Sequence, residues 1–292
     1  MVSRITGAAV ALVCAAALCA CAGPDQPALP TASELPEPTV STVSVSAPAR
    51  VSSSSVAPPE APLQSLLDDI VADITALYGG TIGIAVAGAD GVTMAGFDAP
   101  SPAWSTIKVP IAIAALRANP GLYADAQAAL TVSDNDAAAR LYDAVGPDAV
   151  NQVLAEMGAG AQVNTVLTRP GFSTFGQTML TTGQEAVMAG QLGCVPGAAD
   201  VLALMRQVDA SQAYGLGTTG DAAYKGGWGP DEAGMYTTRQ FGLMPRGDGT
   251  VAAVAITALP ADGSYGAGQG MLNAAALALQ EQAGLLPRAA CG

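Results

Sequence analysis

Hydrophobic residues recur at helical spacing just after residue 60, and then the period changes. The residues at this spacing are Leu66, Leu67, Ile70, Ile74 and Leu77. They predict an amphipathic helix over 63–78 that ends at Gly79-Gly80. Two β-like runs follow at 81–87 and 92–97, and Ala89-Asp90-Gly91 between them is a hairpin signal.

The middle of the chain has a helical period, and β-like runs return in its last third. We expect helices at about 105–117, 134–144, 147–157, 182–191, 198–208 and 268–283, and strands at about 221–227, 236–244 and 250–258. Pro110 is compatible with the first of these helices only near its start. The order predicts a mixed α/β (α+β) fold, with a sheet lobe from both chain ends (about 61–102 and 215–292) and an inserted all-helical lobe (about 103–214).

The N-terminus has the pattern of an export signal. Arg4 precedes an apolar run from Ala8 to Ala20, which is shorter than the ~20 residues of a membrane-spanning helix. Leu18-Cys19-Ala20-Cys21 resembles a bacterial lipobox, in which the leader is removed before Cys21 and this cysteine is acylated. We therefore expect a signal peptide at 1–20 and lipid anchoring to the outer face of the cell membrane, with a plain secretory leader as the alternative.

Residues 22–60 contain eight prolines among Ala, Ser, Thr and Val, and no aromatic residue. Such a composition cannot bury a core, so 21–60 is expected to be the lipidated Cys21 followed by a disordered tether. Residues 61–292 are long enough for one sizeable core. We interpret them as one folded domain, expected to be a monomer.

Charge and histidine content limit the function classes. Residues 61–292 hold nine basic and twenty acidic side chains, which disfavours nucleic acid and anionic lipid as partners. A role in solubility alone is the alternative interpretation of this charge. The chain has no histidine, which excludes a Ser-His-Asp triad, a Cys-His pair and ordinary zinc sites. We expect no metal and no cofactor, and a hydrolase of this sequence must use another base.

Two cysteines lie beyond Cys21, namely Cys194 and Cys291. In an oxidising compartment they predict one disulfide, which would tie the segment after the helix at 182–191 to the C-terminus. A pair of buried free thiols is the alternative.

A lysine can activate a serine without histidine, and Ser105-Thr106-Ile107-Lys108 places such a pair on one helix face. Ser105 at a helix N-terminus would also gain from the helix dipole. Two further segments are Ser133-Asp134-Asn135 at a helix start and Lys225-Gly226-Gly227-Trp228 at a strand end. Taken singly, the three segments are also typical of a solvated helix end, a helix N-cap and a glycine turn.

The lysine content connects the first and third segments. Lys108 and Lys225 are the only two lysines in the chain, and all other cationic side chains are arginines. Arginine does not release its proton in proteins, whereas a partly desolvated lysine can. Lysine therefore occurs only where proton transfer would require it.

The ordered set S-T-I-K, S-D-N and K-G-G resembles the S-x-x-K, S-D-N and K-T-G signature of class A β-lactamases and related penicillin-binding proteins. The similarity extends to Val109-Pro110 after the first motif, to Arg140 after the second and to Arg239-Gln240-Phe241-Gly242 after the third. It covers about residues 63–285. The resemblance implies a β-lactamase/transpeptidase-like fold, in which an antiparallel sheet is flanked by the terminal helices.

The resemblance also implies a role for each matching residue. Ser105 would be the acylated nucleophile and Lys108 its proton acceptor. Ser133 would pass the proton to the leaving group, helped electrostatically by Lys225. The backbone N–H groups of Ser105 and Trp228 would form the oxyanion hole. The substrate-binding residues would be Asn135, Gly226, Gly227 and Arg239.

The resemblance implies a specific contact, or the loss of one, at three of the substrate-binding positions. Asn135 would hydrogen-bond the substrate amide, and Arg239 would pair with a substrate carboxylate; an ordinary surface arginine is the alternative for Arg239. We interpret Gly227 as the replacement of the K-T-G threonine, which removes a hydroxyl that would bind the carboxylate. The 28 residues from Ser105 to Ser133 are far fewer than in class A enzymes, so a more open cleft is expected.

The largest departure is a missing carboxylate. No Asp or Glu occurs from Met157 through Gln184, the stretch where class A enzymes keep the glutamate that activates the deacylating water. Gln177 and Asn164 could orient a water there but could not accept its proton. Glu185 is interpreted as the capping-box partner of Thr182 at a helix start.

These features favour an exported, lipid-anchored serine acyl-transfer enzyme of the penicillin-recognising type, D,D-peptidase- or esterase-like and a poor β-lactamase. A catalytically degenerate domain that binds a wall component or a protein partner is the alternative. A true β-lactamase with an unusual deacylation route is the third interpretation. The expected ligand is a cell-wall peptide or a β-lactam-like small molecule, with the membrane contacted only through the lipid.

Overall fold

The computed structural model describes residues 60–292. The expected signal peptide at 1–20, the acylation of Cys21 and the tether apart from Glu60 lie outside the described residues. Within them, no helix combines the length and the apolar character that crossing a membrane requires.

In the described chain one α-helix precedes the first strand and another follows the last strand, as the hydrophobic pattern predicted. Its helices are α1 (Glu60–Tyr78), α2 (Lys108–Ala118), α3 (Tyr123–Thr131), α4 (Asn135–Glu156), α5 (Thr182–Gln191), α6 (Ala199–Met205) and α7 (Tyr265–Glu281). Its strands are β1 (Thr81–Gly88), β2 (Gly91–Gly96), β3 (Ser101–Pro102), β4 (Met179–Leu180), β5 (Ala223–Pro230), β6 (Tyr236–Pro245) and β7 (Val251–Leu259). Short 3-10 turns connect several of them, including Trp104–Ile107 directly before α2.

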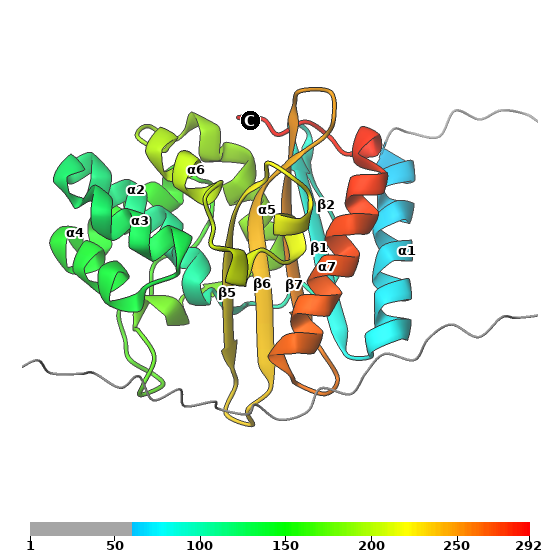
Figure 1. Ribbon diagram of the computed structural model, residues 1–292, viewed down its shortest axis with the longest axis horizontal. Helices are drawn as coiled ribbons and strands as arrows, with labels where there is room; N and C mark the ends of the chain where they lie inside the picture. The colour runs from blue at the N-terminus through cyan, green and yellow to red at the C-terminus, as the bar shows by residue number, and fades with distance from the viewer. Residues whose placement is uncertain (1–59) are drawn as a thin grey trace, which may run out of the picture. The chain divides into compact units, whose positions relative to one another are not determined.

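Both ends of the described chain build one sheet, so the predicted antiparallel sheet with an inserted helical region is confirmed. The strand order is β2-β1-β7-β6-β5, and every neighbouring pair is antiparallel. β1 pairs with β7 in a register that places Ile84 opposite Ile256. β5 is an edge strand of this sheet, on the side that faces the helical region in Figure 1.

β1 places large and small side chains on opposite faces of the sheet. Along β1, Ile82, Ile84 and Val86 join the core under α1 and α7, whereas Ala85 and Ala87 join the core on the other face. α1 and α7 lie side by side on the first face (Figure 1). α5 packs on the second face, where a β-carbon built on Gly190 would lie 3.4 Å from the Cβ of Ala87. The alternation of bulky and small residues therefore lets α5 approach the sheet closely.

The helical region is organised around α2, which is buried along most of its length and packs on α3 and α4. The two helices expected at 134–144 and 147–157 form one element, α4, which bends at Gly146-Pro147 because Gly146 has a φ of 72° and Pro147 cannot donate a helical hydrogen bond. α3 was not expected. Its buried face consists of Ala126, Ala129 and Leu130, which is too small to stand out in the sequence.

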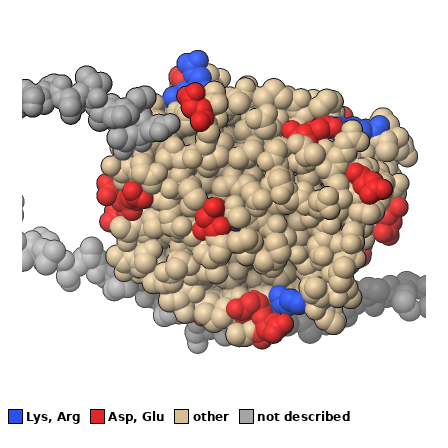
Figure 2. Space-filling model, turned by 180° about the vertical axis from the view of Figure 1, so that it is seen from behind, with Lys and Arg blue, Asp and Glu red and all other residues tan. Residues whose placement is uncertain are grey.

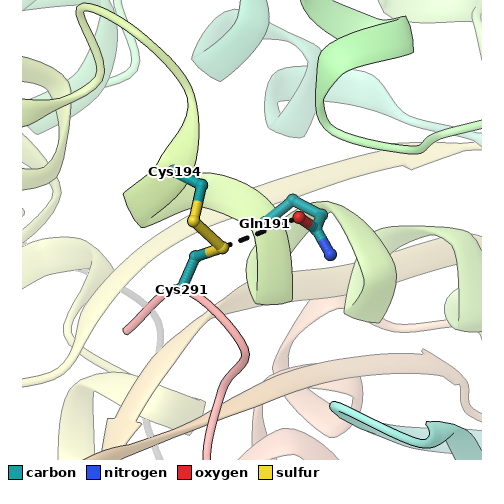
Figure 3. Close-up of a disulfide and its surroundings, with 3 residues drawn as sticks. All are labelled: Gln191, Cys194 and Cys291. Atoms are coloured by element: carbon teal, nitrogen blue, oxygen red, sulfur yellow. Dashed lines mark hydrogen bonds between the residues drawn. A yellow bond between two sulfur atoms is a disulfide. The ribbon is translucent and has the colours of Figure 1, made fainter.

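The predicted disulfide is present. Cys194 and Cys291 are bonded, with their α-carbons 5.2 Å apart. The bond joins the turn after α5 to the C-terminal segment, and Gln191 of α5 lies beside it (Figure 3). The alternative of two free thiols is therefore wrong.

Acidic side chains dominate the charged surface. On the face seen in Figure 2 they form scattered groups, and the few basic side chains lie near its edges, with no continuous basic patch on this part of the described chain. This distribution agrees with the low sequence pI of about 4.1.

Candidate active site

Ser105 lies in the 3-10 turn Trp104–Ile107, between β3 and α2. α2 begins at Lys108, three residues later than predicted. The backbone N–H of Lys108 donates to the carbonyl of Ser105, so the two residues stand one turn apart on the same side. The Ser105 side chain is half-buried and that of Lys108 is buried. Within residues 60–292, no hydrogen bond joins Ser105 Oγ to Lys108 Nζ.

Ser133 brings the two lysines together. Lys108 Nζ donates to the Ser133 carbonyl at 2.6 Å and to Ser133 Oγ at 3.3 Å, and it also donates to Asn135 Oδ1 at 2.7 Å. Lys225 Nζ donates to the same Ser133 Oγ at 3.0 Å and to the Gly226 carbonyl at 2.9 Å. A hydroxyl has two lone pairs and one proton, so Ser133 can accept from both lysines and still donate its proton to a third group.

The local chain geometry presents Ser133 to these lysines. Asp134 caps α4, since its Oδ1 accepts from the N–H of Ala137 at 2.7 Å. Ser133 stands immediately before this cap with a φ of 60°, a left-handed conformation that is uncommon outside glycine. The interpretation of S-D-N as a helix cap is therefore correct for Asp134, while Ser133 and Asn135 face the lysines.

Burial changes the proton affinity of both lysines. Burial lowers the pKa of Lys108 from 10.5 to about 8, and the charge of Asp134 acts in the opposite direction. Burial and the nearby charge of Lys108 lower the pKa of Lys225 well below its usual value. Neither lysine belongs to an ion pair with a carboxylate in residues 60–292. Since two ammonium groups repel each other here, the pair releases a proton far more readily than free lysine.

β5 carries Lys225 and packs directly against the Ser105 turn. A β-carbon built on Gly227 would lie 2.5 Å from the Ala103 carbonyl oxygen and 2.9 Å from the Ser105 backbone nitrogen. Only glycine permits this approach of one backbone to the other. Because β5 is an edge strand, the N–H groups on its outer side have no strand partner. The expected oxyanion donors, the N–H groups of Ser105 and Trp228, therefore come from two segments in contact.

The interpretation of Gly227 as the replacement of the motif threonine is wrong. Counting from Lys225, the threonine position is Gly226, and Gly227 matches the glycine of K-T-G. A β-carbon at position 226 would meet Tyr214 Oη first, at 3.3 Å, rather than backbone atoms. The threonine hydroxyl of the motif is therefore missing at position 226 and not at position 227.

The structure contradicts both interpretations of Arg239. Its side chain is fully buried, so it is neither a surface arginine nor free to bind a substrate carboxylate. Its Nε donates to Glu185 Oε2 at 2.9 Å. The remaining guanidinium N–H groups face Ser101 and three backbone carbonyls, those of Pro102, Leu180 and Thr181. Arg239 lies opposite Gly227 in the sheet, but its side chain points into the core under α5.

The expected capping role of Glu185 is also wrong. The N-cap of α5 is Thr181, whose capping-box partner is Gln184. The register is shifted by one residue, which the adjacent threonines Thr181 and Thr182 made ambiguous. Glu185 is instead fully buried, and its Oε1 accepts from Thr106 Oγ1 at 2.6 Å. Burial raises the pKa of Glu185, and Arg239 acts against this shift.

The loop between α4 and β4 uses its two amides for its own structure. Gln177 Oε1 accepts from the N–H groups of Thr168 and Arg169 at 3.2 and 2.9 Å, and its Nε2 faces three carbonyls of the same loop. Asn164 donates to the carbonyls of Val166 and Thr174. The expectation that Gln177 and Asn164 orient a water is not supported, because their polar atoms are already occupied by the loop.

Sequence reasoning missed several residues around Ser105. Trp104 precedes Ser105 with a φ of 52°, and its ring lies against Phe172 and under the guanidinium of Arg169. Arg169 also donates to the Pro230 carbonyl at 2.6 Å, which ties the loop to the end of β5. Nothing in the spacing of these residues marked them. Among residues 60–292, no group of three or more His, Cys, Asp or Glu side chains is placed to hold a metal ion.

The sequence matches no protein-family model and no curated protein, so the comparison rests on solved structures. A β-lactamase from Sphaerobacter thermophilus is 20% identical, with a TM-score of 0.59 over 76% of this chain and 98% of that one. A class A β-lactamase from Mycobacterium abscessus is 16% identical, with a TM-score of 0.61 over 75% and 99%. A β-lactamase from Chitinophaga pinensis is 15% identical, with a TM-score of 0.60 over 74% and 98%. Residues 60–292 therefore adopt the fold of the class A β-lactamases.

Proposed function

We propose that the protein is a serine acyl-transfer enzyme of the penicillin-recognising type, with Ser105 as its nucleophile. The observation that carries the proposal is the Ser133 hydroxyl, which accepts from two buried lysines beside the Ser105 turn. Solvated helix ends and glycine turns do not bury two lysines around one hydroxyl. The fold supports the proposal, since the similar structures are β-lactamases.

The hydrogen bonds of Ser133 support the later part of the proton path, and the position of Ser105 one turn before Lys108 supports its first step. Neutral Lys108 takes the proton of Ser105 as Oγ attacks the substrate carbonyl, and the N–H groups of Ser105 and Trp228 stabilise the oxyanion. When the tetrahedral intermediate collapses, Ser133 gives its proton to the leaving nitrogen or oxygen. Lys108, now an ammonium in contact with Ser133 Oγ, returns a proton to Ser133. The acyl group remains on Ser105 as an ester.

The second half of the reaction lacks a dedicated base. No carboxylate occurs from residue 157 through 184, and the loop amides are occupied by the loop itself. Lys108 can serve again, as a base for water or another acceptor. General-base assistance is worth ~10² to 10⁴ in rate, so we expect an acyl-enzyme that outlives that of a competent β-lactamase by this range.

We further propose that the enzyme is exported and held by lipid at Cys21, and that its natural substrate is a cell-wall peptide or a related ester or amide. The lipobox-like segment and the proline-rich stretch before the folded domain support this location. A tether of that length would let the domain reach wall material outside the membrane.

The test is intact-mass measurement of the purified protein mixed with a fluorescent penicillin, with Ser105→Ala as the matched control. A covalent adduct on the native protein, absent from the control and lost over hours rather than seconds, is the expected result. Absence of any adduct with the penicillin and with an activated aryl ester would instead support a non-catalytic binding domain. Hydrolysis of nitrocefin at many turnovers per second would show a true β-lactamase with an unusual deacylation route.

A further inference from the structure

A buried ion pair lies directly beneath the nucleophile turn. Arg239 of β6 and Glu185 of α5 contact each other at 2.9 Å, and both side chains are inaccessible to solvent. The proton path proposed above uses neither of them. Desolvating two charges costs about as much as their attraction returns, so a buried pair is weak support for stability alone. Its position suggests another role.

The ion pair contacts the nucleophile turn on both sides of Ser105. After Ser105, Thr106 Oγ1 lies 2.6 Å from Glu185 Oε1. Before Ser105, Arg239 Nη1 donates to the carbonyl of Ser101 at 3.0 Å and to that of Pro102 at 3.1 Å. The chain from β3 to the start of α2 is therefore anchored at both ends of a short span, and both anchors lead to one ion pair.

The residue between these anchors is strained. Trp104 has a φ of 52°, which is costly for a bulky side chain and persists only where the surroundings over-determine it. Within residues 60–292 its indole N–H is also buried without a hydrogen-bond partner. The turn would relax if the anchors were released, and Ser105 would move with it.

We propose that Arg239 and Glu185, acting through Thr106, are positioning residues that hold the Trp104–Ile107 turn in the conformation that aligns Ser105 with Lys108. The inference rests on the proposed function for its catalytic consequence. Its structural part, the fixation of the turn, does not depend on that function. Arg239 thus supports the nucleophile turn from the core under α5 instead of binding substrate.

Thr106→Val and Thr106→Ser form the matched pair for a test. Valine has nearly the shape of threonine but cannot bond Glu185 or the Ala103 carbonyl, which Thr106 Oγ1 also contacts at 2.7 Å. Serine keeps the hydroxyl and loses only a methyl group. Thr106 is fully buried, and both variants leave the ion pair itself intact. Glu185→Gln is a second variant that keeps the shape of the carboxylate and removes its charge.

Each variant is tested in the full chain by two measurements. The first is amide hydrogen exchange of residues 103–108, and the second is the acylation rate with fluorescent penicillin, separated into its maximal rate and its half-saturating concentration. We expect Thr106→Val to raise exchange in this segment about tenfold or more. We also expect it to reduce the maximal rate about 10- to 100-fold with little change in half-saturation, while Thr106→Ser stays near the native protein in both.

Equal exchange and equal acylation in Thr106→Val and Thr106→Ser would overturn the inference. Loss of deacylation alone in Glu185→Gln would also overturn it, since Glu185 would then act on the water rather than on the turn. If the native protein is not acylated by any probe, the proposed function fails, and the exchange measurement still decides whether the hydroxyl of Thr106 fixes the turn.

Discussion

At the scale of single residues, the main feature of the candidate site is that neither of its two lysines pairs with a carboxylate in residues 60–292. Lys108 and Lys225 are almost completely buried, and their partners are a hydroxyl, an amide oxygen and backbone carbonyls. Such neutral partners stabilise an ammonium less than a carboxylate would. The site therefore holds a primary amine, that of Lys108, whose pKa is lowered to about 8.

This arrangement predicts a definite pH dependence of acylation. Lys108 must be neutral to accept the proton of Ser105, and burial lowers its pKa to about 8. The neutral fraction, and with it the acylation rate, should rise about tenfold per pH unit below this value and level off above it. Asp134 is the charged group that acts on Lys108, and Lys108 in turn acts on Lys225. The measurement is the adduct formation rate from about pH 6 to about pH 9.

Lys108→Arg is the matched variant, because arginine keeps the positive charge but does not release its proton. It should acylate at least ~10² times more slowly at every pH in this range. A rate that does not change between pH 6 and 9 in the native protein would remove Lys108 from the role of base.

At the scale of elements, the site depends on how closely β5 approaches the Ser105 turn. The built β-carbon at Gly227 collides with two backbone atoms, the Ala103 carbonyl oxygen and the Ser105 nitrogen. Backbone atoms cannot rotate away as the end of a side chain can. At Gly226 the nearest atom is Tyr214 Oη at 3.3 Å, which belongs to a side chain.

Gly227→Ala and Gly226→Ala should therefore differ, although both add one methyl group to the same strand. We expect Gly227→Ala to lower the free energy of unfolding by about 1–3 kcal/mol, because the strand or the turn must move. It should also abolish acylation, since the displaced atoms include the proposed oxyanion donor of Ser105. Gly226→Ala should cost less than about 1 kcal/mol and retain acylation. Urea denaturation and adduct formation check both variants, and similar losses in the two would contradict this account.

The elements also show which parts of the site could be predicted from sequence. Strand and helix periods located the sheet and most helices. The first two motifs lie at the start of a helix, whereas the third lies inside β5 and not at a strand end as expected. The burial of Arg239 had a signal in the alternation of β6, since Phe241 and Leu243 lie on the same face. Its pairing with Glu185 had none, because the two residues are 54 positions apart and only tertiary packing joins them.

At the scale of the whole molecule, the two ends of the described chain stabilise each other. β1 pairs with β7, and α1 and α7 share one core on the same face of the sheet. The segment after α7 crosses to the other side, where Ala289 N–H donates to the Val251 carbonyl at 2.8 Å and Cys291 N–H donates to the Gly190 carbonyl at 3.0 Å. These hydrogen bonds place the C-terminal segment at the end of α5 with or without the disulfide.

The disulfide should consequently contribute stability without deciding the fold. Cys194 and Cys291 are 97 positions apart, and closing a loop of this size restricts the unfolded chain enough to stabilise the native state by about 2–4 kcal/mol. We expect a reductant to lower the midpoint of urea unfolding, and Cys194→Ser with Cys291→Ser to lower it equally and to abolish the effect of the reductant. Acylation of Ser105 below the transition should persist, since the motif residues contact neither cysteine. An unchanged midpoint after complete reduction, verified by thiol titration, would show that the C-terminal hydrogen bonds alone hold this segment and that the loop constraint contributes nothing.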